Sequence, residues 1–293
     1  MNKRRQLRAL LNGPDIIVAP GAYDGGTAML VEAAGFPAVY MTGAGVSATY
    51  GLPDYGLLTL TEMVSRAATV ARSVMIPAIV DADTGYGNEL NVTRTVQEYE
   101  AAGVAALHIE DQVSPKRCGH VAGKEVVSRD DFLAKIQAAV AARTDPDLVL
   151  IARTDSRATL GLDEAIARAN AALEVGADLI FLEATTSVEE AASVPKRVNG
   201  PCLLNMVLGG RTPVLDTTVA QKMGYRMAIQ PVILISTLVA YGMEMLKALK
   251  DTGKHPSVPG DLSIEELFRQ FGSEKWDQLR TDLLRANKIA HVV

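Results

Sequence analysis

Short apolar runs recur along this chain and alternate with longer stretches in which apolar residues return every three or four positions. None of the runs contains Asp, Glu, Lys or Arg, and such uninterrupted runs are typical of strands that are buried on both faces of a parallel sheet. The pattern predicts eight strands, near residues 16–19, 38–41, 77–80, 106–109, 148–151, 179–182, 202–205 and 227–229.

The stretches between the runs carry the end signals of helices. Residues 61–73, 91–102, 128–143 and 162–175 each begin with a capping residue or an acidic turn, and Gly or Pro follows within a few positions. Eight strands that alternate with helices predict an α/β fold of the (β/α)8 TIM-barrel type, in a single domain over residues 1–293. Further helical stretches predict a C-terminal helical extension over about residues 233–293.

Composition narrows the class of protein. A net charge of −5 and a pI near 5.5 argue against binding to nucleic acid or to an anionic membrane, both of which need a basic face. No uncharged apolar run approaches the ~20 residues that span a bilayer, and the basic start of the chain is not followed by the apolar core of a signal peptide. The two cysteines, Cys118 and Cys202, form neither a disulfide framework nor a zinc motif. The sequence therefore predicts a soluble, cytoplasmic protein.

The segment 116–120, Lys-Arg-Cys-Gly-His, carries the clearest chemical signal. A thiol between cationic residues and a histidine, in a segment that glycines allow to bend, is typical of a positioned and reactive cysteine. The alternative is that Cys118 is a small core residue, as many free cysteines are. Cys202 fits that alternative because the run 201–204 is apolar, whereas the charged surroundings of Cys118 are not a core pattern.

Polar residues follow the predicted strands. In (β/α)8 enzymes the active site lies at the carboxyl ends of the strands, so we expect these residues to converge on one cavity. They are Thr42 to Gly45, Asp81 to Gly85, Glu110, Asp111 and the cysteine segment, Arg153 to Asp155, Glu183, Asn205 and Gln230.

Asp81 and Asp83 lie two residues apart after the third strand, and we expect Asp54 and Glu110 to approach them. Several carboxylate oxygens without a histidine or thiolate favour Mg²⁺, with Mn²⁺ as the alternative metal. The two aspartates could instead cap a turn or a helix, because Asp-x-Asp is a common pattern.

Gly43 and Gly45 partly match a dinucleotide-binding turn. We expect residues 49–53 to break the helix that such a turn opens, which would remove the helix N-terminus that binds phosphate. Backbone amides that hold a substrate carboxylate explain these glycines better.

Jointly, these motifs resemble the isocitrate lyase and phosphoenolpyruvate mutase superfamily. The matching segments, in family order, are residues 51–54 (Gly-Leu-Pro-Asp), 80–87 (Val-Asp-Ala-Asp-Thr-Gly-Tyr-Gly), 108–112 (His-Ile-Glu-Asp-Gln), 116–120 and 151–155 (Ile-Ala-Arg-Thr-Asp). The resemblance extends over roughly residues 5–290, although Val121 departs from the family pattern. Cys118 marks the lyase branch, because the mutase branch carries Asn in the equivalent loop.

The resemblance implies a barrel whose eighth helix is exchanged with a neighbour, in a homotetramer built as a dimer of dimers, with Mg²⁺ at the strand ends. It makes Asp81 and Asp83 the metal-site aspartates and the segment around Cys118 a mobile lid. The implied catalytic residues are Cys118, Tyr40, Lys116, His120 and Glu110. The implied substrate contacts are Thr42, Gly43, Ala44, Asp54, Gly119, Arg153, Glu183 and Asn205.

The implied reaction is cleavage of the C2–C3 bond of a 2-hydroxydicarboxylate, such as 2,3-dimethylmalate or a 2-alkylmalate, to a 2-oxo acid such as pyruvate and a short carboxylate. In it Tyr40 takes the proton of the 2-hydroxyl group and Cys118 donates a proton to the carbanion. Lys116, Arg117, His120 and Arg153 offset the negative charge that develops.

The alternative substrate is the tricarboxylate 2-methylisocitrate, which would give pyruvate and succinate. A lyase for it is expected to carry Asn-x-Thr-Glu-Phe-Gly after the seventh strand and an arginine at the position of Ser236. Residues 205–210 read Asn-Met-Val-Leu-Gly-Gly instead, so a buried third carboxylate would lack partners, at a cost of ~3–5 kcal/mol. Pro231 also replaces the serine expected of an oxaloacetate hydrolase. A phosphorylmutase, a 2-oxo acid decarboxylase and a catalytically silent carboxylate-binding barrel are the remaining alternatives.

Overall fold

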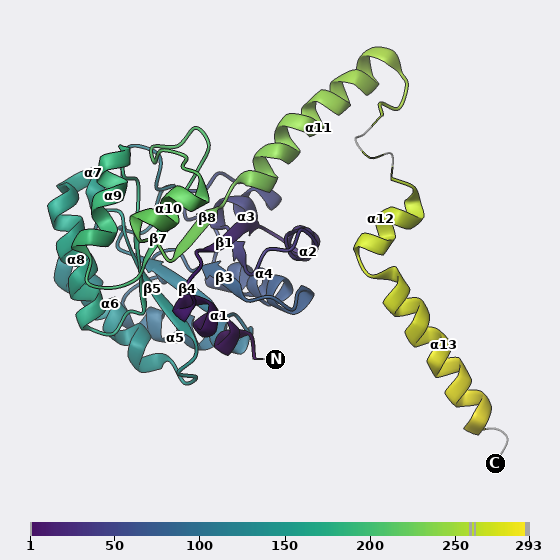
Figure 1. The fold of residues 1–293 in the computed structure, drawn as a ribbon, viewed down its shortest axis with the longest axis horizontal. Helices are drawn as coiled ribbons and strands as arrows, with labels where there is room; N and C mark the ends of the chain where they lie inside the picture. Colours follow the sequence, from purple (N-terminus) through teal and green to yellow (C-terminus); the bar gives the residue numbers. More distant parts are fainter. Residues whose placement is uncertain (1, 258–259, 261, 291–293) are drawn as a thin grey trace. The chain divides into compact units, whose positions relative to one another are not determined.

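The computed structural model describes residues 2–257, 260 and 262–290 and divides into two compact units, residues 1–237 and 238–293. Within the described residues of the first unit, eight parallel strands form a closed barrel in sequential order (Figure 1). They are β1 (Ile17–Ala22), β2 (Val39–Met41), β3 (Ala78–Asp81), β4 (Ala106–Glu110), β5 (Val149–Thr154), β6 (Leu179–Leu182), β7 (Cys202–Asn205) and β8 (Met227–Gln230). The predicted (β/α)8 class and the eight predicted strands are confirmed.

Helices follow the strands, as the sequence predicts. They are α1 (Lys3–Asn12), α2 (Gly25–Ala33), α3 (Gly43–Thr49), α4 (Leu60–Ser73), α5 (Glu89–Ala101), α6 (Arg129–Ala142), α7 (Arg157–Leu160), α8 (Leu162–Glu174), α9 (Val188–Arg197), α10 (Thr217–Met223), α11 (Ile233–Thr252), α12 (Ile264–Gln270) and α13 (Ser273–Ala290). Thr59 and Asn88 begin α4 and α5 with reciprocal capping boxes, which satisfy backbone N–H groups that have no partner within the helix.

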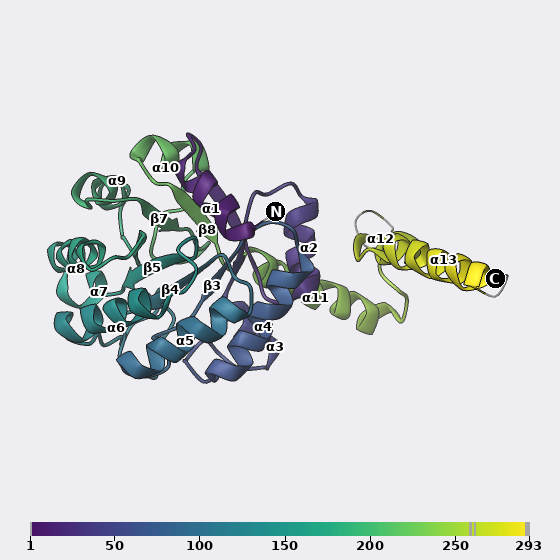
Figure 2. The same cartoon turned by 90° about the horizontal axis from the view of Figure 1, so that it is seen from below.

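The core has two layers because successive strand residues face opposite sides of the barrel wall. Tyr40, Ile79, Ile151 and Phe181 belong to a cluster inside the barrel, while the residues between them pack against the surrounding helices. Leu7 of α1 joins the inner cluster and is completely buried. Helix α1 therefore closes the amino end of the barrel (Figure 2), which leaves the carboxyl end for the site.

The second unit contains most of α11, together with α12 and α13. Ser263 and Glu266 form a capping box at the start of α12. The predicted extension over residues 233–293 thus contains three helices in its described part, and residues 258, 259, 261 and 291–293 lie outside that part. The single domain and the exchanged helix remain predictions. No helix in the described ranges has both the length and the hydropathy to cross a bilayer.

Candidate active site

One small cavity of about 50 Å³ lies at the carboxyl ends of the strands, where the sequence places the site. Its lining includes these residues of the predicted site: Tyr40, Thr42, Ala44, Asp54, Asp81, Cys118, Gly119, His120, Arg153, Glu183 and Asn205. Gly43, Asp83, Glu110 and Lys116 do not line it but contact residues that do. The structure therefore brings the whole predicted set together, and the apolar residues Val207, Pro231 and Val232 complete the wall.

Asp81, the last residue of β3, is held in a fixed orientation by backbone amides. Its Oδ1 accepts a hydrogen bond from the Asp83 N–H at 2.9 Å, and its Oδ2 accepts one from the Gly43 N–H at 3.2 Å. A Cβ atom on Gly43 would lie 2.6 Å from Asp81 Oδ2, so this approach requires glycine. Helix α3 begins at Gly43 and ends at Thr49, where the sequence predicts a break. The first backbone N–H of α3, that of Gly43, therefore binds the Asp81 carboxylate of the protein itself.

Asp83 lies in the left-handed backbone region, with φ of 47°, which is costly for a residue other than glycine and is often found at functional sites. Burial, with Asp81 and Asp54 nearby, raises the pKa of Asp83 to about 6 despite the charge of Lys116. Burial also opposes ionisation of Asp81, yet His108, Lys116 and Arg153 lower its pKa to about 2. The two aspartates thus sit in different electrostatic surroundings although they are two residues apart.

Lys116 connects the cysteine segment to the barrel. Its ammonium group contacts Asp54 Oδ1 and lies 2.9 Å from Asp83 Oδ1, while the side chain is only 3% exposed. Burial disfavours the charge, but Asp83, Asp54 and Asp81 raise the pKa of Lys116 well above its ordinary value. Lys116 therefore stays cationic.

The residues at the end of β3 and β4 fit a hard divalent cation. Glu110 Oε1 is buried without a hydrogen bond, and burial raises the pKa of Glu110 well above its ordinary value despite Arg153. A cation would stabilise these crowded carboxylates in their ionised form. Across the described residues, no three His, Cys, Asp or Glu side chains form a ready-made metal cluster. Mg²⁺ is usually held by one or two carboxylates and completes its shell with water and substrate oxygens.

Tyr40 lies inside the barrel and its hydroxyl is 2.7 Å from Nε2 of His108. Burial, together with Asp81, raises the pKa of Tyr40 well above its ordinary value, so this residue is a neutral phenol. Burial lowers the pKa of His108 to about 4, which leaves the imidazole neutral. A phenol of this kind cannot accept a proton unless it passes its own proton on, and His108 Nε2 is placed to receive it.

Cys118 is half-buried and faces the cavity from the segment after β4. Burial raises the pKa of its thiol above the ordinary value, and the nearby Asp54 adds to that effect. Arg153 and the His120 N–H lower this pKa, but burial outweighs them, while Lys116 pairs with aspartates and the Arg117 guanidinium lies 5.7 Å from the centre of the Tyr55 ring. Cys118 is therefore a protonated thiol, which suits a proton donor better than a nucleophile.

A buried network joins the ends of β5, β6 and β7. Arg153 pairs with Glu110 Oε2 at 3.0 Å and with Glu183 Oε2 at 3.4 Å. The side-chain amide of Asn205 donates to Glu183 Oε2 at 2.9 Å and lies 3.2 Å from His120 Nε2. Burial lowers the pKa of His120 despite Glu183, so its ring is neutral, and the Arg211 N–H donates to its Nδ1 at 3.0 Å.

The structure adds residues that the sequence motifs did not single out. Lys124 is buried and donates to Asp155 Oδ1 at 2.7 Å and to the carbonyl oxygen of Gly119 at 2.5 Å. A lysine beside Gly123 in a lid gives little signal by itself, because most lysines are exposed. Ser236, in contrast, donates to the carbonyl oxygen of Val232, the residue before α11, and does not line the cavity.

Comparisons with known proteins agree with this geometry. The family model described as phosphoenolpyruvate phosphomutase matches residues 7–250. The 2,3-dimethylmalate lyase of Eubacterium barkeri is 47% identical over 252 residues, which cover 86% of this chain and 87% of that protein. The 2-methylisocitrate lyase of Aeropyrum pernix is 42% identical over 252 residues, covering 86% of this chain and 81% of that protein.

Solved structures give the same result. A crystal structure of 2,3-dimethylmalate lyase, a member of the PEP mutase/isocitrate lyase superfamily, matches with a TM-score of 0.91 and 43% identity, covering 97% of this chain and 96% of that chain. A phosphonopyruvate hydrolase in complex with oxalate and Mg²⁺ matches with a TM-score of 0.87 and 32% identity, covering 97% of this chain and 100% of that chain. The chain therefore belongs to the phosphoenolpyruvate mutase and isocitrate lyase superfamily.

Proposed function

We propose that the protein is a Mg²⁺-dependent carbon–carbon lyase. Its substrate is a 2-hydroxydicarboxylate of the 2,3-dimethylmalate or 2-alkylmalate type, and its products are a 2-oxo acid such as pyruvate and a short carboxylate. The observation that carries the proposal is the protonated Cys118 thiol, which shares one cavity with Asp81, Arg153 and Asn205. The 47% identity to a 2,3-dimethylmalate lyase supports the same reaction class.

Substrate binding relies on charge. Burial disfavours the Arg153 guanidinium, yet Asp155, Glu110 and Glu183 raise its pKa well above the ordinary value, so it presents a permanent positive charge to a carboxylate. Thr42 and the amide of Asn205 line the same cavity and supply neutral donors. Asp81 and Asp83 would hold Mg²⁺, and the bound metal would supply a Lewis acid for the 2-hydroxyl group and its neighbouring carboxylate.

The reaction removes one proton and supplies another. Tyr40 accepts the proton of the 2-hydroxyl group as its own proton passes to His108 Nε2, 2.7 Å away. The C2–C3 bond then breaks, its electron pair remains on C3, and C2 becomes the carbonyl carbon of the 2-oxo acid. Cys118 donates its proton to C3 and becomes a thiolate. Lys116 stays paired with Asp54 and Asp83, so its charge acts from behind the cavity wall.

Substrate choice follows from the apolar side of the cavity. Val207, Pro231 and Val232 line it without adding a charge, which favours alkyl substituents over a third carboxylate. The experiment that tests this function measures 2-oxo acid release through a coupled reductase, with Mg²⁺ and with EDTA. The substrate panel consists of 2,3-dimethylmalate, 2-alkylmalates, 2-methylisocitrate, isocitrate and oxaloacetate. We expect turnover of the dicarboxylates in Mg²⁺ and loss of turnover in EDTA.

Other outcomes identify the alternatives. Preference for 2-methylisocitrate would make the protein a 2-methylisocitrate lyase and would show that other residues hold the third carboxylate. Phosphonate turnover would indicate a phosphorylmutase, and CO₂ release a decarboxylase. The homotetramer with exchanged C-terminal helices is part of the same proposal, and light scattering on the purified protein tests the number of subunits.

A further inference from the structure

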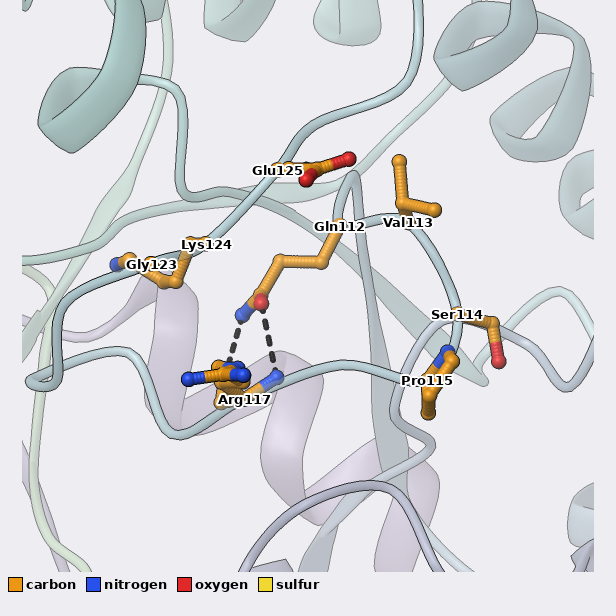
Figure 3. A pocket seen from close by; sticks show the side chains of 8 residues that line it. All are labelled: Gln112, Val113, Ser114, Pro115, Arg117, Gly123, Lys124 and Glu125. Carbon is orange, nitrogen blue, oxygen red and sulfur yellow. Dashed lines mark hydrogen bonds between the residues drawn. The ribbon is translucent and has the colours of Figure 1, made fainter.

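The lid that carries Cys118 comprises residues 113–125 and closes on itself at its base. Gln112 and Val126 form an antiparallel bridge there, and the Val113 N–H donates to the Glu125 carbonyl oxygen at 2.9 Å. A cavity of about 220 Å³ lies within this loop, between its two arms (Figure 3). Because side chains do not fill that space, packing alone does not fix the path of the lid.

Gln112 binds the backbone on the N-terminal side of Cys118. Its Oε1 accepts from the Arg117 N–H at 3.0 Å, and its Nε2 donates to the Arg117 carbonyl oxygen at 2.8 Å (Figure 3). The two backbone groups fix the orientation of the amide, since one can only donate and the other can only accept. Gln112 is 1% exposed and lies two residues after the end of β4. It therefore ties the backbone of Arg117, the residue before the thiol, to the barrel wall.

Lys124 binds the backbone on the other side of Cys118. Its Nζ donates to the Gly119 carbonyl oxygen at 2.5 Å and to Asp155 Oδ1 at 2.7 Å. Gly119 itself is pressed against the site, because a Cβ atom there would lie 2.5 Å from Glu183 Cγ and 2.6 Å from Arg153 Nη2. A small shift of this backbone would therefore change both the thiol position and the substrate contacts.

We propose that Gln112 and Lys124 are positioning residues for Cys118, which hold the backbone at Arg117 and Gly119 so that the thiol is fixed toward the cavity. Neither side chain lines the cavity that takes the substrate, so both act through the backbone of the lid. The effect on turnover rests on the proposed function. The effect on the accessibility of the thiol does not, and this separates the two in an experiment.

The test measures alkylation of Cys118 by iodoacetamide together with turnover, using the full-length protein with Mg²⁺ and the variants Gln112→Met and Gln112→Glu. The methionine keeps the length of the side chain without its hydrogen bonds, whereas the carboxylate still accepts from the Arg117 N–H but cannot donate to the carbonyl oxygen. Trypsin releases a peptide that begins at Cys118, so mass spectrometry follows this thiol separately from Cys202. Cys202 is buried in the core and reports global unfolding.

For Gln112→Met we expect Cys118 alkylation to rise about 5- to 30-fold through local opening of the lid, with Cys202 alkylation unchanged. We expect kcat to fall about 10- to 100-fold with KM within about threefold, because a displaced proton donor affects the chemical step more than binding. Gln112→Glu should lie between Gln112→Met and the wild type. Lys124→Met should increase Cys118 alkylation as well.

Glu125→Gln is the matched control, since it changes an exposed residue that lines the same lid cavity and should leave both readouts at the wild-type level. Unchanged alkylation of Cys118 in Gln112→Met would overturn the inference, whether or not kcat falls. A parallel rise at Cys202 would overturn it too, because the substitution would then act through global stability. Increased Cys118 alkylation in a protein whose wild type cleaves no substrate of the panel would uphold the positioning role and reject the proposed function.

Discussion

Both ends of this barrel carry buried charged residues, but these are well paired at the amino end and crowded together at the carboxyl end. At the amino end, Arg8 of α1 pairs with Asp178 Oδ1 at 2.7 Å and donates to the Leu148 carbonyl oxygen at 2.9 Å. Arg4 pairs with Asp145 at 2.8 Å, and Arg226 donates to the Leu11 carbonyl oxygen at 2.9 Å. Each guanidinium thus meets carboxylates or carbonyl groups that need a donor, which stabilises the closure of the barrel by α1.

At the carboxyl end, buried charges crowd together and several polar atoms lack partners. In the part of the chain that the structure describes, Asp83 Oδ1 and Glu110 Oε2 make ion pairs with Lys116 and Arg153 but no hydrogen bond, while one buried atom each of His108, Glu110, Thr185 and Asn205 has no hydrogen bond. These residues lie in β4 and β7 or within three residues after β3 and β6. Unpaired buried groups cost stability, so this end gives up folding free energy to hold groups ready for a ligand.

The largest expected effect is on kcat and tests the carboxyl end of the barrel. Cys118→Ser should lower kcat about 10²- to 10⁴-fold, the usual contribution of a general acid, because a serine hydroxyl is a far weaker acid than a thiol. The measurement is 2-oxo acid release at saturating substrate. Cys202→Ala is the control and should keep wild-type kcat, since Cys202 lies in the core away from the cavity. Wild-type turnover in Cys118→Ser would remove Cys118 from the mechanism.

The next largest effect is on the free energy of unfolding and tests the amino end of the barrel. Arg8→Met should lower the free energy of unfolding by about 2–3 kcal/mol, because it removes charge-assisted hydrogen bonds from a partly buried guanidinium. Urea unfolding measures this change, and kcat should stay at the wild-type value. Arg5→Met removes an exposed ion pair with Asp147 and should cost less than about 1 kcal/mol. Equal losses in the two variants would mean that burial does not distinguish them.

A third prediction is that one substitution, at Glu110, raises stability and lowers activity. The pKa of Glu110 is raised in the folded protein, so its contribution to stability is complete below the unfolded-state pKa and is lost as the pH rises. At pH 7 without metal, Glu110→Gln should therefore stabilise the protein by about 1 kcal/mol while lowering turnover. Thermal unfolding in EDTA and assays in Mg²⁺ give the two readouts. Loss of stability at pH 7 would show that the ion pair with Arg153 outweighs burial.

The smallest expected effect concerns pH. Burial and Asp54 raise the pKa of Cys118 above its ordinary value, so the thiol remains protonated through neutral and mildly alkaline pH. The kcat profile should therefore show no loss from this group below the ordinary thiol pKa, and iodoacetamide reactivity of Cys118 should rise only at higher pH. A fall in kcat near neutral pH that disappears in Cys118→Ser would mean that the cations of the lid do reach the thiol.

Local patterns predicted much of the fold. The runs near residues 78–81 and 179–182 are strands because uninterrupted apolar side chains can be buried on both faces only inside a parallel sheet. Helix α4, capped by Thr59, begins one residue before its predicted start at residue 61, and α5, capped by Asn88, begins two residues before its predicted start at residue 91. The cavity wall at Val232 and the contact of Lys124 with Gly119 were harder to predict, since neither residue carries a motif that distinguishes it from ordinary core and surface residues.

The sequence by itself determined which side chains reach the carboxyl ends of the strands, because strand order and period are local properties of the chain. Only the tertiary structure decided what those side chains do to one another. Asp54 meets Lys116 across 62 positions of sequence, and Tyr40 meets His108 across 68. Folding likewise buries Cys118 near Asp54, which raises the pKa of its thiol and keeps it protonated. The physical reason is that a pKa depends on burial and on distances between charges, which are set only when the chain is folded.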